Sequence, residues 1–250
     1  MAVLVLGDGA VQALRAGIAG EVLVAGDAGY EDARTIFNAM INRRPAVIVQ
    51  CERVEDVAAS IRFAREHGLE IGVRGGGHSV AGKALSNGGI VVDLRRLNAV
   101  AVDPDARTAT VAGGATMSHL DRATEPYGLA TTGGRVSTTG VGGFTLGGGT
   151  GWLDRKFGLA CDNLLSVELV TADGATVRAS EDENPELFWA LHGGGGNFGV
   201  ATSFRFRLHP LPSVTAALLL WSRERGPEVV RGYRDLLEAA PDEIAAGCCT

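Results

Sequence analysis

The stretch Arg74-Gly75-Gly76-Gly77-His78-Ser79-Val80-Ala81-Gly82 directly follows an apolar run, Leu69 to Val73, which predicts a strand. Three adjacent glycines leave a row of backbone N–H groups with no Cβ in the way, so this loop can wrap closely around a phosphate. Arg74 adds a fixed positive charge, and the His78 ring can reach whatever the phosphate carries. A lone glycine-rich loop is weak evidence, however, and a tight turn with a chance histidine explains this stretch equally well.

The loop lies at the end of a β-α-β unit. Ala46–Val49 is a continuous apolar run, typical of a strand buried on both faces. Val54–His67 has apolar residues at helical spacing, with acidic residues in the first turn and Arg65 near the end. Ligands of open α/β sheets bind outside the carboxyl ends of strands, where this loop lies. A nicotinamide-binding Rossmann domain fits poorly, because no Gly-x-Gly-x-x-Gly opens the helix after the first strand.

The pattern changes from residue 98 onward. After a third strand at 90–94, the sequence predicts a hairpin over 99–111, a helix at 116–125, a second hairpin over 164–179 and a strand at 200–208. Pro210 and Pro212 mark a boundary. A strand at 214–221 and a helix at 227–239 follow, and this pair is too small to build a core.

A second glycine cluster spans residues 133–151 and holds nine glycines. Each glycine costs roughly 0.5–1 kcal/mol relative to alanine inside a helix or strand, so we expect neither element here. A backbone laid against a large flat ligand explains the composition. A flexible surface loop is the alternative, but Val141, Phe144, Leu146 and Trp152 are spaced through the cluster as packing anchors.

Composition excludes several classes of protein. Of the 250 residues 36 are glycine, about twice the average share, while 46% hydrophobic and 21% charged residues are ordinary for a globular protein. A net charge of −6 argues against a nucleic-acid partner. The cysteines at 51, 161, 248 and 249 suit neither a metal site nor a disulfide framework, which favours reduced thiols and a cytoplasmic location. No apolar run is long enough to cross a membrane.

Several further motifs occur in a characteristic order. They are Arg74–Ser79, Val91–Leu94, Val136–Gly151, Thr171–Gly174, Asn184–Ala190 and Gly193–Val200. Together they resemble the FAD-binding domain of the vanillyl-alcohol oxidase (PCMH-type) superfamily. Within it, the likeness is to FAD-linked oxidases related to berberine bridge enzyme and 6-hydroxynicotine oxidase. The resemblance covers roughly residues 40–210.

This resemblance implies an α+β fold in which FAD lies between two subdomains. Residues 40–97 would form a small parallel sheet with helices, and residues 98–210 a larger antiparallel sheet with helices. Residues 1–39 are expected to be a helical, loosely organised lead-in. Residues 211–250 would begin a substrate domain that is incomplete in this chain.

The resemblance also carries site residues over to this sequence. His78 matches the histidine that bonds covalently to the 8-methyl group of the flavin. Val136 stands where many members have a cysteine with a second covalent link, so a single link is expected. The positions that match cofactor contacts are Arg74, Gly75, Gly76, Gly77, His78, Ser79, Gly82, Val136, Ser137, Thr138, Gly140, Gly142, Gly143, Gly147, Gly148 and Val200.

The activity implied is removal of hydride from a C–H next to an alcohol or amine of a small organic substrate. Electrons would pass from the flavin to oxygen or another acceptor, and the identity of Thr139 leaves oxidase and dehydrogenase behaviour both open. The family's general base is expected beyond residue 250. The alternative is a fragment that binds FAD without turnover.

Overall fold

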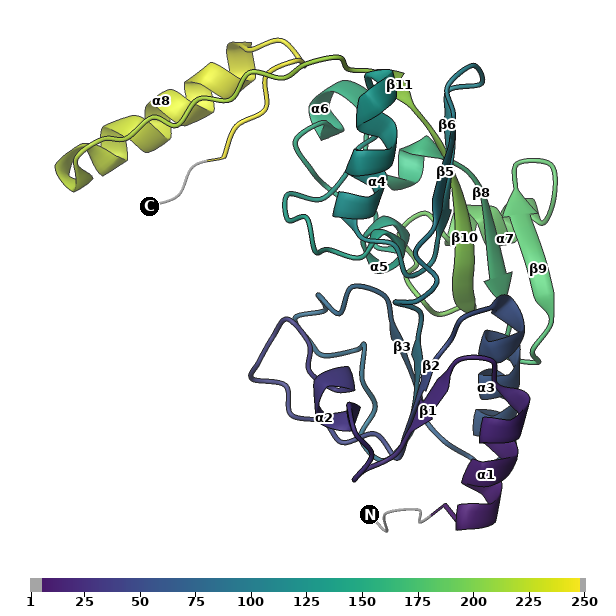
Figure 1. Cartoon of the computed structure of the whole chain (residues 1–250). Coiled ribbons are helices and arrows are strands. Elements are labelled where there is room, and N and C mark those ends of the chain that lie inside the picture. Colours follow the sequence, from purple (N-terminus) through teal and green to yellow (C-terminus); the bar gives the residue numbers. More distant parts are fainter. Residues whose placement is uncertain (1–5, 248–250) are drawn as a thin grey trace.

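The structure is a computed structural model that describes residues 6–247, and it contains two subdomains stacked along one axis (Figure 1). The first has a four-stranded sheet with strand order β1-β2-β4-β3. Its strands are β1 (Glu21–Leu23), β2 (Val47–Gln50), β3 (Ile71–Arg74) and β4 (Ile90–Asp93). Strands β2, β3 and β4 run parallel, and β1 joins the edge in antiparallel orientation. The expected parallel sheet is therefore confirmed.

The centre of this sheet is fully buried. The side chains of β2 and β4 from Val47 to Val49 and from Ile90 to Val92 have no exposed surface. Helix α3 (Val54–Glu66) turns Val57, Ile61 and Ala64 into the same core. A parallel strand covered on both faces needs this continuous run of apolar residues.

The N-terminal segment is more ordered than the sequence indicates. It contains α1 (Asp8–Gly17), β1 and the short α2 (Tyr30–Ala33), whereas we expected a loosely organised helical lead-in. Val11, Leu14 and Val22 join the core that α3 and β2 form. A three-residue strand has too short a pattern to be recognised, and the pairing of β1 with β2 decides its conformation.

The second subdomain is built on a five-stranded antiparallel sheet with strand order β5-β6-β10-β8-β9. Its strands are β5 (Val100–Asp103), β6 (Thr108–Ala112), β8 (Leu164–Val170), β9 (Thr176–Ser180) and β10 (Val200–Arg207). Phe204 and Phe206 on β10 anchor its core. The remaining elements are α4 (Met117–Thr124), η1 (Glu125–Tyr127), α5 (Val141–Leu146), α6 (Asp154–Phe157), η2 (Cys161–Asn163), α7 (Pro185–Ala190), and the paired β7 (Leu129–Ala130) and β11 (His209–Pro210).

One expectation for the glycine cluster was wrong, because residues 141–146 form the helix α5. Val141 and Leu146 are buried and anchor the helix in the core of the second subdomain. A Cβ on Gly142 would lie 3.3 Å from the Phe204 ring and 3.2 Å from the Gly113 carbonyl oxygen. Tertiary packing therefore outweighs the poor helix propensity of glycine at this position.

The segment after residue 211 extends away from both subdomains (Figure 1). Residues 214–221, expected as a strand, are extended without a strand assignment, because no neighbouring strand pairs with them among residues 6–247. They are followed by η3 (Arg223–Arg225) and by α8 (Gly226–Ala239), which confirms the expected helix. Helix α8 buries none of its residues. No helix within the described range is long and apolar enough to cross a membrane.

Candidate functional site

The two glycine-rich loops come into direct contact where the subdomains meet. A Cβ on Gly76 would clash with the Gly140 backbone and lie 2.8 Å from the carbonyl oxygen of Thr138, and a Cβ on Gly140 would clash with the Gly76 backbone. A Cβ on Gly75 would reach the carbonyl oxygen of Gly113 at 3.4 Å. Segments some 60 residues apart in sequence thus form one surface. We call this surface, formed by the loops at 74–78 and 138–140, the cradle.

The loop after β3 has free donors for an anion. The amide N–H groups of Gly76, Gly77 and His78 donate no hydrogen bond to any described residue. Gly77 has a left-handed backbone conformation, with φ +72°, which L side chains rarely adopt. Successive amides in such a turn form a concave site for a phosphate group.

His78 is held at this meeting point. Its Nε2 lies 2.8 Å from the Thr138 hydroxyl, and its ring stacks on Phe37 with centroids 4.2 Å apart and planes at 17°. Burial lowers the pKa of His78 below its ordinary value, so the ring is neutral at neutral pH. A neutral imidazole has a lone pair, which a nucleophile needs.

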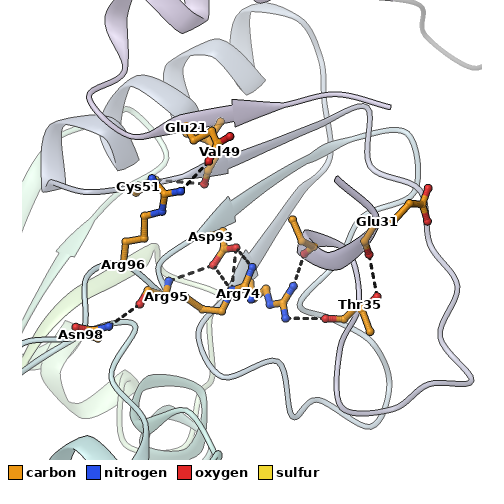
Figure 2. Close-up of polar contacts among 11 residues, drawn as sticks. Glu21, Glu31, Thr35, Val49, Cys51, Arg74, Asp93, Arg95, Arg96 and Asn98 are labelled. Atoms are coloured by element: carbon orange, nitrogen blue, oxygen red, sulfur yellow. Dashed lines mark hydrogen bonds and ion pairs between the residues drawn. The ribbon is translucent and has the colours of Figure 1, made fainter. Parts of the chain in front are cut away.

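The Arg74 side chain has hydrogen-bond partners within the protein. Its side chain is 6% exposed, and its guanidinium donates hydrogen bonds to the carbonyl oxygens of Ala33 and Thr35 (Figure 2). Burial and, to a smaller extent, the nearby Arg95 charge lower the pKa of Arg74 to about 10, and Asp93 opposes this shift. The charge of Arg74 thus fastens the segment after α2. Its buried Nε has no hydrogen-bond partner within the described residues, and a Cβ on Gly77 would lie 3.5 Å from it.

Residues 33–38, which we call the strap, also belong to the site, although the sequence analysis did not include them. The Phe37 amide donates to the Gly77 carbonyl at 3.2 Å, and the Asn38 side chain donates to the Val80 carbonyl at 2.9 Å. Ile36 lies against Gly77. The strap has no periodicity and no motif, so only the folded chain reveals that it lies along the glycine loop.

Helix α5 presents a bare backbone beside the cradle. Gly143 and Gly147 are exposed and lie four residues apart, so they share one face near the end of the helix. A Cβ on Gly143 would meet no atom within 4 Å. Val136, Ser137 and Thr138 are exposed ahead of the helix. This exposed surface carries no side chain at Gly143 and Gly147, so a planar ring can approach the backbone there closely.

The other predicted positions lie around this surface with different local roles. Gly142 faces the core, and Gly148, with φ +101°, begins the turn after α5. The Ser79 hydroxyl accepts from the Lys83 amide at 3.2 Å, and Gly82, with φ +70°, closes the same turn. These two residues shape the loop.

Val200 is buried at the start of β10 and belongs to the core of the first subdomain together with Val170 of β8. It therefore lies at the junction of the two sheets. The following residues of β10 lead back to the site, because the Gly113 amide donates to the Thr202 carbonyl at 2.8 Å.

Gly113 and Gly114 also belong to the junction, although the sequence assigned them no role. A Cβ on Gly114 would overlap the carbonyl of Leu94, and one on Gly113 would overlap that of Ala201. Their clustering was a usable signal, but a glycine required by close backbone approach resembles a turn glycine in sequence.

The fold and the cradle define a class of protein, a flavin-binding domain of the PCMH type. A family model described as "FAD binding domain" matches residues 45–180, more than half of the chain, and the chain belongs to this family. Unpaired amides beside a bare helix face fit a cofactor that combines a pyrophosphate with a planar ring.

Curated relatives and solved structures support this membership. The chain is 41% identical to (R)-6-hydroxynicotine oxidase from Paenarthrobacter nicotinovorans over 82% of this chain and 45% of the relative. It is 38% identical to xylooligosaccharide oxidase from Thermothelomyces thermophilus, over 81% and 41%. The structure of Physcomitrella patens BBE-like 1 matches with a TM-score of 0.76 and 33% identity, covering 80% of this chain and 44% of the other. The chain spans about half the length of the relatives it matches.

Proposed function

We propose that this chain holds FAD between its subdomains with a single covalent link through His78. In the whole protein, the flavin would oxidise a C–H next to an alcohol or amine of a small organic substrate. The observation that carries the proposal is the contact between the loop at 74–78 and the loop at 138–140, which brings free amides, a neutral histidine and a bare helix face together.

Different residues of the chain would bind different parts of FAD. The amides of Gly76, Gly77 and His78 would bind the pyrophosphate, because they are free donors in a concave turn. The faces of Gly143 and Gly147 would support the planar ring. Val136 would lie near the ring without forming a bond. When bound, FAD accepts a hydride and passes two electrons on to oxygen or another acceptor.

The names of the relatives indicate which class of substrate to propose. One relative acts on 6-hydroxynicotine, an amine, and another on xylooligosaccharides, which are polyols. Both substrate types have a C–H carbon that is bonded to nitrogen or to a hydroxyl oxygen. We therefore propose a small amine or sugar as the substrate of the whole protein, with the general base in the part of the family fold outside this chain.

The covalent link is tested by acid precipitation of the purified chain. Yellow colour should stay with the precipitated protein and be lost in His78→Ala. The matched control is His67→Ala, because His67 also stacks on a phenylalanine ring, Phe63, but lies at the end of α3. Colour released from the unmodified chain by acid would contradict the covalent link while leaving reversible FAD binding intact.

A second candidate function is FAD binding without turnover, which the coverage of about half of each relative favours. Anaerobic mixing of the flavin-loaded chain with 6-hydroxynicotine or xylobiose distinguishes the two. Bleaching of the flavin absorbance would support catalysis by this chain. A yellow but unreactive chain would support the binding fragment.

A further inference from the structure

The ring of His78 is held by two residues from distant parts of the chain, Phe37 and Thr138. We propose that these two are positioning residues for covalent attachment of the flavin, so that attachment depends on the strap as well as on the glycine loops. The proposal rests on the proposed function. It adds to that function the two residues that orient the imidazole before the bond forms.

Phe37 is 66% exposed, yet the strap that carries it is held to the glycine loop at several points. Its own amide is bound to the Gly77 carbonyl, and the neighbouring Asn38 is bound to the Val80 carbonyl. Arg74 binds the carbonyl of Thr35 at 2.6 Å, two residues earlier. The backbone of Phe37 is thus fixed relative to the loop that carries His78, and its ring covers one face of the imidazole.

Thr138 restrains the imidazole in its own plane. The Thr138 backbone is held against Gly76 by the contact between the loops, so its hydroxyl has a defined place. When Nε2–H donates to this hydroxyl, the lone pair is on Nδ1. The Nδ1 atom makes no hydrogen bond with the described residues, so its lone pair is available. Stacking on Phe37 and the hydrogen bond to Thr138 together restrict the ring to one orientation, and the proposal requires the tautomer in which Nε2 carries the proton.

In the attachment step a bond forms between Nδ1 and the carbon of the flavin 8-methyl group, and one C–H and the imidazole N–H are lost. Two electrons and two protons therefore leave, and dioxygen or another two-electron acceptor takes them. A nucleophile already aligned with its target reacts much faster than a freely rotating one, so loss of either restraint should slow this step.

The experiment uses the full chain, prepared without flavin and then mixed with FAD in air. The variants are Phe37→Ala and Thr138→Val, with Thr138→Ser as the conservative rescue and Met40→Ala as the control. Met40 is 90% exposed and follows the strap closely, whereas the described partners of the His78 ring are Phe37 and Thr138. Acid-stable flavin is measured against time, and the ¹⁵N shifts of the His78 ring are recorded before FAD is added.

We expect Phe37→Ala and Thr138→Val to slow attachment by about tenfold or more, while Thr138→Ser and Met40→Ala stay within about twofold of the original chain. The flavin-free chain should show a single His78 tautomer with Nε2 protonated, and Thr138→Val should show a mixture. The ring signals do not depend on flavin, so they report the restraint directly.

Two results would overturn the proposal in distinguishable ways. Attachment at an unchanged rate in both Phe37→Ala and Thr138→Val would remove the positioning role and leave the covalent link standing. A lack of acid-stable flavin in the original chain would remove the covalent link and with it any role in forming it.

Discussion

Gly76 and Gly140 lie so close together that neither can carry a side chain without displacing the other's backbone. Gly76 follows β3, the parallel strand at the edge of the first sheet, and Gly140 precedes α5 of the second subdomain. This single contact joins the two glycine-rich loops and places Thr138 beside His78. The geometry of the proposed flavin cradle therefore depends on the absence of two methyl groups.

Replacing either glycine should destabilise the protein. Gly76→Ala and Gly140→Ala force backbone against backbone, and overpacking of this kind typically costs about 1–3 kcal/mol or more. Thermal unfolding followed by circular dichroism should show a Tm several degrees lower. The control is Gly9→Ala in α1, where a Cβ meets nothing within 4 Å and alanine favours the helix. Equal Tm values for all three variants would contradict the contact.

A large side chain on the bare face of α5 should block FAD and spare the fold. Gly143→Leu introduces its side chain into open space, so thermal stability should change little, while FAD affinity should fall at least tenfold. Fluorescence titration in a His78→Ala background keeps binding reversible. Gly232→Leu in α8 is the matched control, because it too is a helix glycine with open surroundings. Undiminished affinity in Gly143→Leu would place the ring elsewhere.

The rate of flavin attachment should depend on pH through His78. Only the neutral imidazole has a lone pair, and burial lowers its pKa below the ordinary 6.5. Attachment should therefore be constant at neutral pH and above, and should decline only as the pH falls through the lowered value. Stopped-time acid precipitation across pH 5 to 8 measures this. A decline that starts well above 6.5 would show that another group controls the reaction.

Asp56 should be a main source of stability for the N-terminal segment. Its carboxylate is fully buried and accepts hydrogen bonds from the amides of Ala19, Gly20 and Glu52 at 2.9 to 3.2 Å. Burial alone would raise its pKa, but these bonds and the Arg53 guanidinium outweigh burial and lower it below 3.8. The stabilisation is thus present above the ordinary pKa and is lost as the pH falls through the lowered one.

Asp56→Asn should destabilise the fold at neutral pH by about 1–3 kcal/mol, because an amide NH₂ would face backbone donors. The difference from the original chain should shrink below pH 4. Urea unfolding at pH 7 and pH 3 measures both effects. Glu55→Gln, exposed on the same turn of α3, is the control and should change stability by less than about 0.5 kcal/mol. An equal loss in both variants would contradict the assignment.

The segment after residue 213 should contribute little to the stability of the two sheets. Helix α8 buries no residue, and the segment reaches α6 chiefly through surface bonds from Arg155 to the carbonyls of Ala240 and Ile244. Ending the chain after Ser213 should shift the Tm by no more than about 4 °C. Deleting residues 1–24, which removes β1 and the Val11 and Leu14 contacts, should instead abolish cooperative unfolding. A collapse of Tm in the shorter C-terminal variant would show that α8 is integral to the fold.

Much of the fold could be read from local patterns. The run at 46–49, the periodic helix at 54–67 and the hairpins on either side of residues 103–107 and 171–175 all predict their own elements, because burial on one or both faces imposes the period. Residues 141–146 and 214–221 could not be read this way. Helix α5 is stabilised by packing on Phe204, and the expected strand at 214–221 has no partner among residues 6–247.

The sequence alone determined the two glycine-rich loops, the histidine in the first of them and the family that the chain resembles. Backbone exposure and a nucleophilic ring are properties of residue type and order. Only the tertiary structure decided that the loops touch, that Arg74 braces the strap, and that Phe37 and Thr138 hold His78. These relationships join residues 39 to 64 positions apart. No local preference encodes them, since each depends on the packing of whole sheets and helices between the two ends.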